Sequence, residues 1–178
     1  LDVKDSWIAL KADAEFIGRG TLFPFKLSID SRGRVKRFLV LDDSYKRLPH
    51  WVALDLADIS VVAGITLDET KVVIDHGELK KGTTAVSLAG VLFYDLERGM
   101  KLTFSSKDVD FTHLGGKIAD VLFRGHGPVT GVIQGPYEEP AITASVDLES
   151  FGVEECDFYR VRGNLTYDNF LLSIDGIN

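Results

Sequence analysis

Apolar and polar residues alternate strictly along much of this chain, and this period of two constrains the fold more than any other feature. In residues 142–149, Ile142, Ala144, Val146 and Leu148 fall on one side of an extended chain, and the residues between them are polar or charged. Successive side chains of a β-strand point to opposite faces of the sheet. Because one side is apolar and the other polar, the pattern predicts antiparallel strands with one dry face.

The same alternation recurs in residues 8–16, 23–29, 86–94 and 161–167. Short turn-forming segments separate these runs, at 30–33, 75–77, 81–82, 97–99 and 168–169. The sequence therefore predicts an all-β fold in which long antiparallel strands follow one another as a meander of hairpins.

Two stretches depart from the alternation. Residues 45–58 contain Pro49 and have a mixed period, which indicates a loop followed by a short strand or a helical turn. In residues 112–123, Leu114, Ile118, Val121 and Leu122 lie at roughly helical spacing before a glycine-rich segment. We therefore expect at most one short helix, in the second stretch.

Two hairpin segments of the chain resemble each other. Residues 87–95 and 160–168 align with Gly90 on Gly163, and an alternating strand follows each of them after a turn. The likeness fits either a true repeat, whose units bury their apolar faces by stacking on neighbours, or the general similarity of any two hairpins. We treat residues 1–178 as a single β-rich segment of a longer repetitive protein, with 1–64 and 65–178 as the division to consider.

Charge and composition exclude several classes of protein. The chain has 27 acidic and 20 basic residues among 178, for a net charge of -7, whereas nucleic-acid binders need the opposite balance. The single cysteine, Cys156, has no partner for an internal disulfide, and the four histidines have no metal-ligand spacing. No apolar run reaches the length of about 18 residues that a transmembrane helix requires.

The sequence contains no recognisable catalytic motif. It lacks both a nucleophile elbow and a phosphate-binding loop. Asp108 and Asp110 lack the glycine and distal glutamate of a calcium loop and are expected to be solvated turn residues. An enzyme would need these carboxylates and Asp120 to converge in a cleft. We therefore expect a protein that is not an enzyme and that binds no cofactor or metal.

The apolar side of the strands must be hidden from water, either by a second layer or by apolar ligands such as acyl chains. The period of two in the sequence does not distinguish a second protein layer from bound acyl chains. Small residues among the candidates, Gly90, Ala144 and Gly163, would leave room for chains. The candidate lining residues are Val86, Leu88, Gly90, Leu92, Leu102, Phe104, Ile142, Ala144, Val146, Leu148, Val161, Gly163, Leu165 and Tyr167.

The glycine spacing in residues 127–140 resembles a known family. Gly127, Gly131 and Gly135 recur at every fourth position before Pro136 and Pro140, and the alternating strand 142–149 follows. This arrangement is similar to a signature of the AsmA-like superfamily, of the TamB (translocation and assembly module) type. Residues 159–174 and the acidic–apolar segment 108–111 are similar to flanking parts of that signature. The likeness extends to residues 65–104 and is weak over 1–58.

The resemblance implies a fold, a location and a function. Members of this family form a curved β-sheet, or β-taco, with an apolar groove, and extend through the periplasm of diderm bacteria from an anchor in the inner membrane. They are linked to lipid transport, to outer-membrane biogenesis and to protein translocation and assembly with an outer-membrane β-barrel protein. This chain would be a non-catalytic periplasmic segment that holds phospholipid or other acyl chains along its groove. Free strand edges would allow two copies to dimerise.

The alternative is a β-sandwich module that binds protein or carbohydrate. A sheet covered on both faces would favour this interpretation, as would an exposed Trp7 or Trp51 that offers a platform on which a sugar can stack.

Overall fold

A computed structural model describes residues 2–4, 8–42, 51–113, 117–118, 121–137, 139–168 and 171–175. These residues form fourteen strands and contain no helix, as the alternation predicts. No helix in the described ranges is long and apolar enough to cross a membrane. The strands are β1 (Asp2–Lys4), β2 (Ile8–Thr21), β3 (Lys26–Asp42), β4 (Trp51–Asp68), β5 (Lys71–Lys81), β6 (Thr84–Phe93), β7 (Met100–Asp110), β8 (Lys117–Ile118), β9 (Val121–Gly135), β10 (Ala141–Leu148), β11 (Ser150–Val153), β12 (Cys156–Phe158), β13 (Val161–Asp168) and β14 (Leu171–Asp175).

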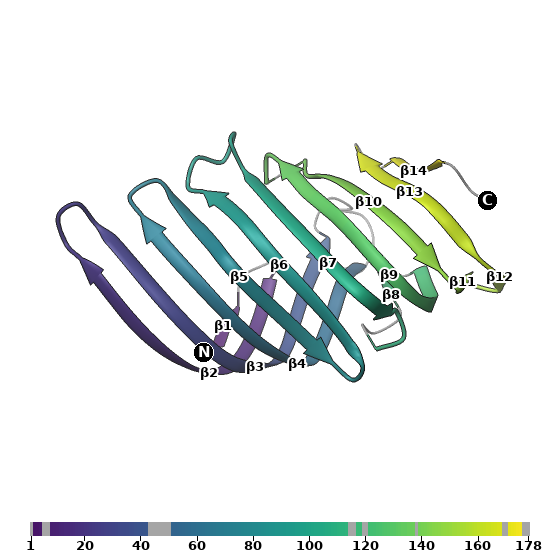
Figure 1. Ribbon diagram of the computed structural model, residues 1–178, viewed down its shortest axis with the longest axis horizontal. Helices are drawn as coiled ribbons and strands as arrows, with labels where there is room; N and C mark the ends of the chain where they lie inside the picture. Colours follow the sequence, from purple (N-terminus) through teal and green to yellow (C-terminus); the bar gives the residue numbers. More distant parts are fainter. Residues whose placement is uncertain are drawn as a thin grey trace.

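All these strands belong to one antiparallel sheet (Figure 1). Its order is β1-β2-β3-β4-β5-β6-β7-β9-β10-β13-β14, so neighbours in the chain are mostly neighbours in the sheet. The predicted meander of hairpins is confirmed, but the turns expected at 30–33 and 75–77 are wrong, because these residues lie inside β3 and β5. A β-sandwich needs two sheets packed face to face, and the described strands form a single one.

The sheet is curled. In Figure 1 the beginnings of β2 and β4 and the end of β3 pass behind β5, β6 and β7. Register shifts interrupt the long strands, between Lys11 and Ala12 where β2 meets β3 and between Gly64 and Ile65 where β4 meets β5. Asp58 in β4 adopts a φ of 58°. Such irregularities increase local twist and bend a strand, so they account for the curvature.

The two-residue strand β8 joins distant parts of the sheet. It pairs with β4 at Leu54 and Ile118, and with β9 at Ile118 and Val121. The first half of β9 pairs with β8 and β11, and its second half pairs with β7 and β10. Gly125 and Gly127 separate these halves with φ values of 120° and 149°, a conformation that favours glycine.

The prediction of a short helix at 112–123 is wrong, because the described residues of this stretch form strands and a turn. Lys117 and Ile118 form β8, and β9 begins at Val121. The apolar spacing here was ambiguous between helix and strand. Pairing with β4 and β9 satisfies the backbone of these residues, and tertiary context overrides a weak local preference. Leu114 and Asp120 lie outside the described residues.

The stretch 45–58 also differs from expectation. Residues 51–58 belong to the long strand β4, and residues 43–50 lie outside the described part of the chain.

Gly90 is the fold feature most open to a direct test. It lies in β6 with a φ of 146°, and a Cβ added there would collide with the carbonyl oxygen of Lys101 on β7. We predict that Gly90→Ala lowers the free energy of unfolding by about 2 kcal/mol through backbone strain and steric overlap. Urea denaturation followed by circular dichroism measures the change.

Gly18→Ala is the matched control, since a Cβ there would meet Leu27 Cδ1 at an ordinary 3.5 Å. Equal stabilities of the two variants would show that the conformation at Gly90 is not required.

Candidate functional site: one apolar face across the sheet

The strand register collects apolar residues on one face. Directly opposed residues of an antiparallel pair project to the same side, so rows of partners can be followed from strand to strand. The central row runs from β2 to β13 through Gly18, Ile29, Ile65, Ile74, Gly90, Leu102, Ile133, Ile142 and Tyr167. The row beside it contains Phe16, Ser31, Ala63, Gly77, Leu88, Phe104, Gly131, Ala144 and Leu165. We call the surface that contains these rows the apolar face.

The register places every predicted lining residue on the apolar face. This includes residues from segments far apart in sequence, such as Leu88 in β6 and Leu165 in β13. Most of these side chains are partly exposed, but Val146, Leu148 and Val161 are buried. The predicted lining residues of β6 and β7 are therefore partly exposed, whereas those at the end of β10 and the start of β13 are packed.

The packed end is a small hydrophobic cluster. Val146, Leu148 and Val161 pack with Phe151 of β11, and Leu148 has no exposed surface. The ring of Phe151 meets that of Phe111 edge-on, with centroids 6.2 Å apart. These contacts form a small core at this end of the apolar face. The lining role of Val146, Leu148 and Val161 stays a prediction.

Sequence reasoning left out the N-terminal half of the apolar face. The rows continue through Phe16 of β2, Ile29 of β3 and Ile65 of β4. The signal was present, because residues 8–16 and 23–29 alternate in the same way as 142–149. What the sequence could not provide was the register that places β2–β4 and β10–β13 on one continuous face.

Small residues flatten the middle of the apolar face. A Cβ added to Gly131 would collide with the ring of Phe104, and one added to Gly77 would lie 3.4 Å from Leu88 Cβ. Glycine therefore lets large neighbours lie flat against the sheet. The predicted role of Gly90, Ala144 and Gly163 in leaving room for acyl chains stays a prediction.

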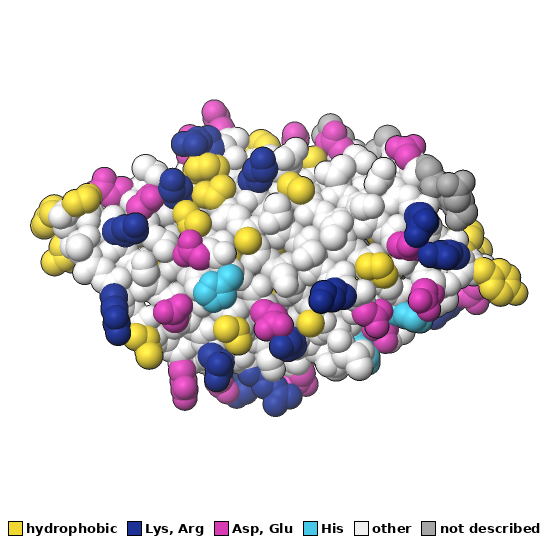
Figure 2. Space-filling view, viewed as in Figure 1, with side chains coloured by type: hydrophobic (Ala, Val, Ile, Leu, Met, Phe, Trp, Pro, Cys, Tyr) yellow, Lys and Arg dark blue, Asp and Glu magenta, His cyan; other side chains and the backbone are white. Residues whose placement is uncertain are grey.

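The opposite face is polar. Figure 2 shows charged side chains of both signs scattered over it, with hydrophobic side chains between them. Asp147 accepts hydrogen bonds from Arg162 and Arg160, and these bonds hold the pKa of its carboxyl below the ordinary value. Thr66 likewise donates to Asp75 at 2.9 Å. This face is suited to contact with water.

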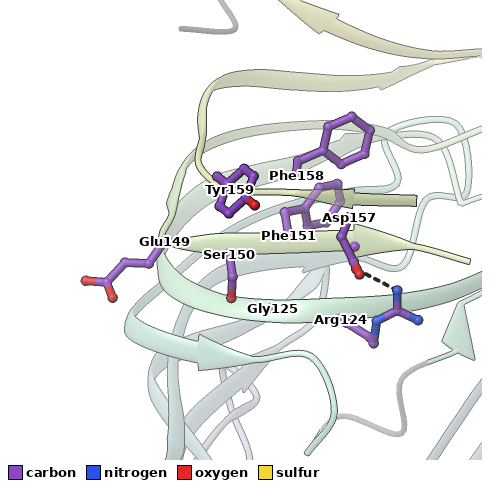
Figure 3. Close-up of a pocket in the computed structure, with 9 residues that line it drawn as sticks. Arg124, Gly125, Glu149, Ser150, Phe151, Asp157, Phe158 and Tyr159 are labelled. Atoms are coloured by element: carbon purple, nitrogen blue, oxygen red, sulfur yellow. Dashed lines mark hydrogen bonds and ion pairs between the residues drawn. The ribbon is translucent and has the colours of Figure 1, made fainter. Parts of the chain in front are cut away.

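A depression of about 550 Å³ lies beside the β11–β12 hairpin (Figure 3). Phe151 and Phe158 stack there with ring centroids 6.2 Å apart, and Tyr159 is 98% exposed. Arg124 is held by Asp157 at 2.6 Å. The site offers aromatic surface, and its arginine is already engaged by a carboxylate.

The carboxylates considered for catalysis do not converge among the described residues. Asp108 lies 3.4 Å from His126, and Asp110 separately accepts hydrogen bonds from Thr112, which lower its pKa. In the same described ranges no three histidine, cysteine or acidic residues gather to hold a metal. Asp120 and Trp7 lie outside the described residues, and the side chain of Trp51 is not described.

The total exposed surface reflects an uncovered sheet. It is 12039 Å², whereas a globular monomer of 19.6 kDa exposes about 8,600 Å². Few hydrophobic side chains of the described residues are buried. The apolar face also contains the buried aliphatic residues of β2, β4 and β7, which are Ala12, Ile59, Ala63 and Val109.

Known proteins add no identification. Comparison with models of protein families, with curated proteins and with solved structures finds no significant match for this chain. The structure establishes an all-β protein built on one large antiparallel sheet with many exposed apolar residues.

The division of the apolar face into a packed end and an open middle predicts a difference in stability. Leu148→Ala removes a fully buried side chain and should lower the free energy of unfolding by about 3 kcal/mol. Leu102→Ala removes a partly exposed side chain on the same face and should cost about 1 kcal/mol or less. Denaturant titration of both variants measures the costs. If the Leu102 variant loses as much as the Leu148 variant, the middle of the face is covered like a core.

Proposed function

We propose that this chain is a non-catalytic segment of a bridge-like lipid transport protein that holds acyl chains along its apolar face. The observation that carries the proposal is the continuity of that face: the central row is apolar or glycine from β2 to β13. Exposed apolar surface of this extent marks a binding surface in a soluble protein.

The shape of the surface favours acyl chains over a compact ligand. The rows cross the strands one after another, so a long flexible chain can lie across Ile65, Gly90 and Leu102 without entering an enclosed cavity. Each methylene removed from water contributes about 0.8 kcal/mol. Because these contacts are non-directional, binding would be tolerant of chain identity, and a chain could move between equivalent positions.

The resemblance described for residues 127–140 supports an assignment to the AsmA-like superfamily, TamB type. These residues cover the second part of β9 and the turn that leads into β10. On this assignment the chain belongs to the periplasm of a diderm bacterium, within a protein anchored in the inner membrane. Its ligand would be phospholipid, and an outer-membrane β-barrel protein would be a partner in outer-membrane biogenesis.

The experiment uses photocrosslinking along β7 in a bacterial host. A photoreactive residue is placed at Leu102 on the apolar face and at Thr103 on the polar face, which are adjacent in the chain. We predict phospholipid adducts at position 102 and almost none at 103, because only the first faces bound acyl chains. Mass spectrometry of the purified protein identifies the adducts.

The same contrast at Leu88 and Ser87 on β6 is the internal replicate. Adducts that fail to alternate between the two faces, or a folded protein that carries no lipid, would refute the proposal.

A further inference from the structure

The turn between β2 and β3 carries large apolar side chains that lie in water. Leu22 is 77% exposed and Phe23 is 95% exposed, and Phe25 beside them is also exposed. We call residues 22–25 the β2–β3 tip. In Figure 1 this turn forms the left end of the sheet, and Figure 2 shows hydrophobic side chains at the same end. Large apolar side chains gathered at a protruding turn mark a site of interaction.

The β2–β3 tip is described throughout. Two undescribed segments, 5–7 and 43–50, adjoin β2 and β3 at the opposite ends of these strands. Ile8 pairs with Val40 near that end, whereas Thr21 pairs with Lys26 at the tip. At about 3.4 Å per residue, roughly 40 Å of strand separates the two ends. The tip is therefore remote along the strands from both segments.

The backbone of the tip is prepared to leave water. The hydroxyl of Thr21 donates a hydrogen bond to the carbonyl oxygen of Pro24 at 2.8 Å, and a proline has no N–H group of its own. The N–H of Phe25 donates to the carboxylate of Glu69 at 3.5 Å, which ties the base of the tip to the neighbouring β4–β5 turn. Unpaired backbone groups are costly in hydrocarbon, so these contacts lower the cost of inserting the turn into a lipid layer.

Basic residues stand directly behind the tip. Residues 16–29 contain Arg19 and Lys26 but no acidic residue, although the whole chain has a net charge of -7. Both lie within about 10 Å of the tip along the strands, and the headgroup layer of a bilayer is about 5–8 Å thick. Their long side chains can reach anionic headgroups while the tip lies below them.

The β6–β7 turn lies along the same margin of the sheet (Figure 1) and exposes two more large apolar residues. Leu96 is 68% exposed and Tyr94 is 51% exposed. The N–H of Tyr94 donates to the carbonyl oxygen of Thr70 at 3.0 Å, which links this turn to the β4–β5 turn. Asp95 and Glu97 flank Leu96, and carboxylates are costly to remove from water. This turn is therefore suited to rest among headgroups while the β2–β3 tip enters more deeply.

The size and shape of the tip favour a bilayer over a protein partner. Its three large apolar side chains offer roughly 500 Å² at most, whereas a stable protein interface buries about 800 Å² on each partner. A bilayer accepts a narrow convex turn without a complementary shape. We propose that this chain docks to an anionic lipid bilayer through the β2–β3 tip, with the apolar side chains inserted and the two basic residues among the headgroups. The proposal does not depend on what the apolar face binds.

The first test is flotation of the full chain with vesicles of phosphatidylethanolamine and phosphatidylglycerol. Phe23→Ser should weaken binding about tenfold or more, because the inserted ring is lost. Tyr159→Ser is the matched control, since Tyr159 is a 98% exposed aromatic residue between β12 and β13, at the other end of the molecule. It should bind as the unaltered chain does, and circular dichroism should show that both variants keep their strands.

Charge reversal tests the place of the basic residues. Lys26→Glu should weaken binding to the anionic vesicles about fivefold or more and leave binding to phosphatidylcholine vesicles unchanged. Lys107→Glu makes the same change of charge at an exposed residue of β7 away from the tip, and it should have little effect. Equal binding of the two variants to anionic vesicles would contradict the proposal.

The second test locates the inserted residue directly. In a Cys156→Ser background, which removes the exposed native thiol, an environment-sensitive fluorophore is attached at Phe23→Cys or at Tyr159→Cys. With vesicles, the label at position 23 should brighten severalfold and be quenched by nitroxide-labelled lipid, whereas the label at position 159 should not change.

Three results would overturn the proposal: a parent chain that does not float with the vesicles, Phe23 and Tyr159 serine variants that bind equally, or a label at position 23 that stays in water. A Phe23→Ser variant that alters sedimentation without lipid but not flotation would instead assign the tip to a protein contact. Crosslinking at Leu102 reports on the apolar face alone, so each of the two proposals can fail without the other.

Discussion

The structure depends on hydrogen-bonded pairing between neighbouring strands rather than on a central hydrophobic core. In most globular proteins burial of apolar surface is the dominant favourable term. Here the ladder runs through the sheet from β1 to β14, while the hydrophobic cluster around Leu148 involves a small part of the chain. A sheet held in this way can keep one face open, because its backbone pairing does not require that face to be covered.

The alternation in the sequence was sufficient to predict strands and their two unlike faces. Ile142 to Leu148 shows this most clearly, and every lining residue chosen on this basis lies on the apolar face. Where along the face the structure becomes packed could not be predicted. Burial of Leu148 depends on β11 returning to pair with β9, at Ser150 and His126, and a local pattern carries no information about that long-range contact.

Irregular positions were only partly visible in the sequence, where the turn signal at 75–77 coincides with the register shift in β5. The register of β4 with β5 shifts beside Gly64, and Asp58 takes a left-handed conformation that asparagine and aspartate tolerate better than most residues. The mistaken helix at 112–123 has a related origin. A short apolar stretch satisfies helical and extended spacing equally well. Here Ile118 is extended because it pairs with β4 on one side and with β9 on the other.

The bridging position of β8 has a mechanical consequence. Because this strand touches both β4 and β9, the strands β4, β5, β6, β7, β9 and β8 form a closed circuit, like a hoop. Flattening the sheet within this circuit would require the Leu54–Ile118 pairing to open. The strands β2 and β3 at the N-terminal margin lie outside the circuit. The curvature of the molecule is therefore clamped near its middle and freer to flex toward its N-terminal margin.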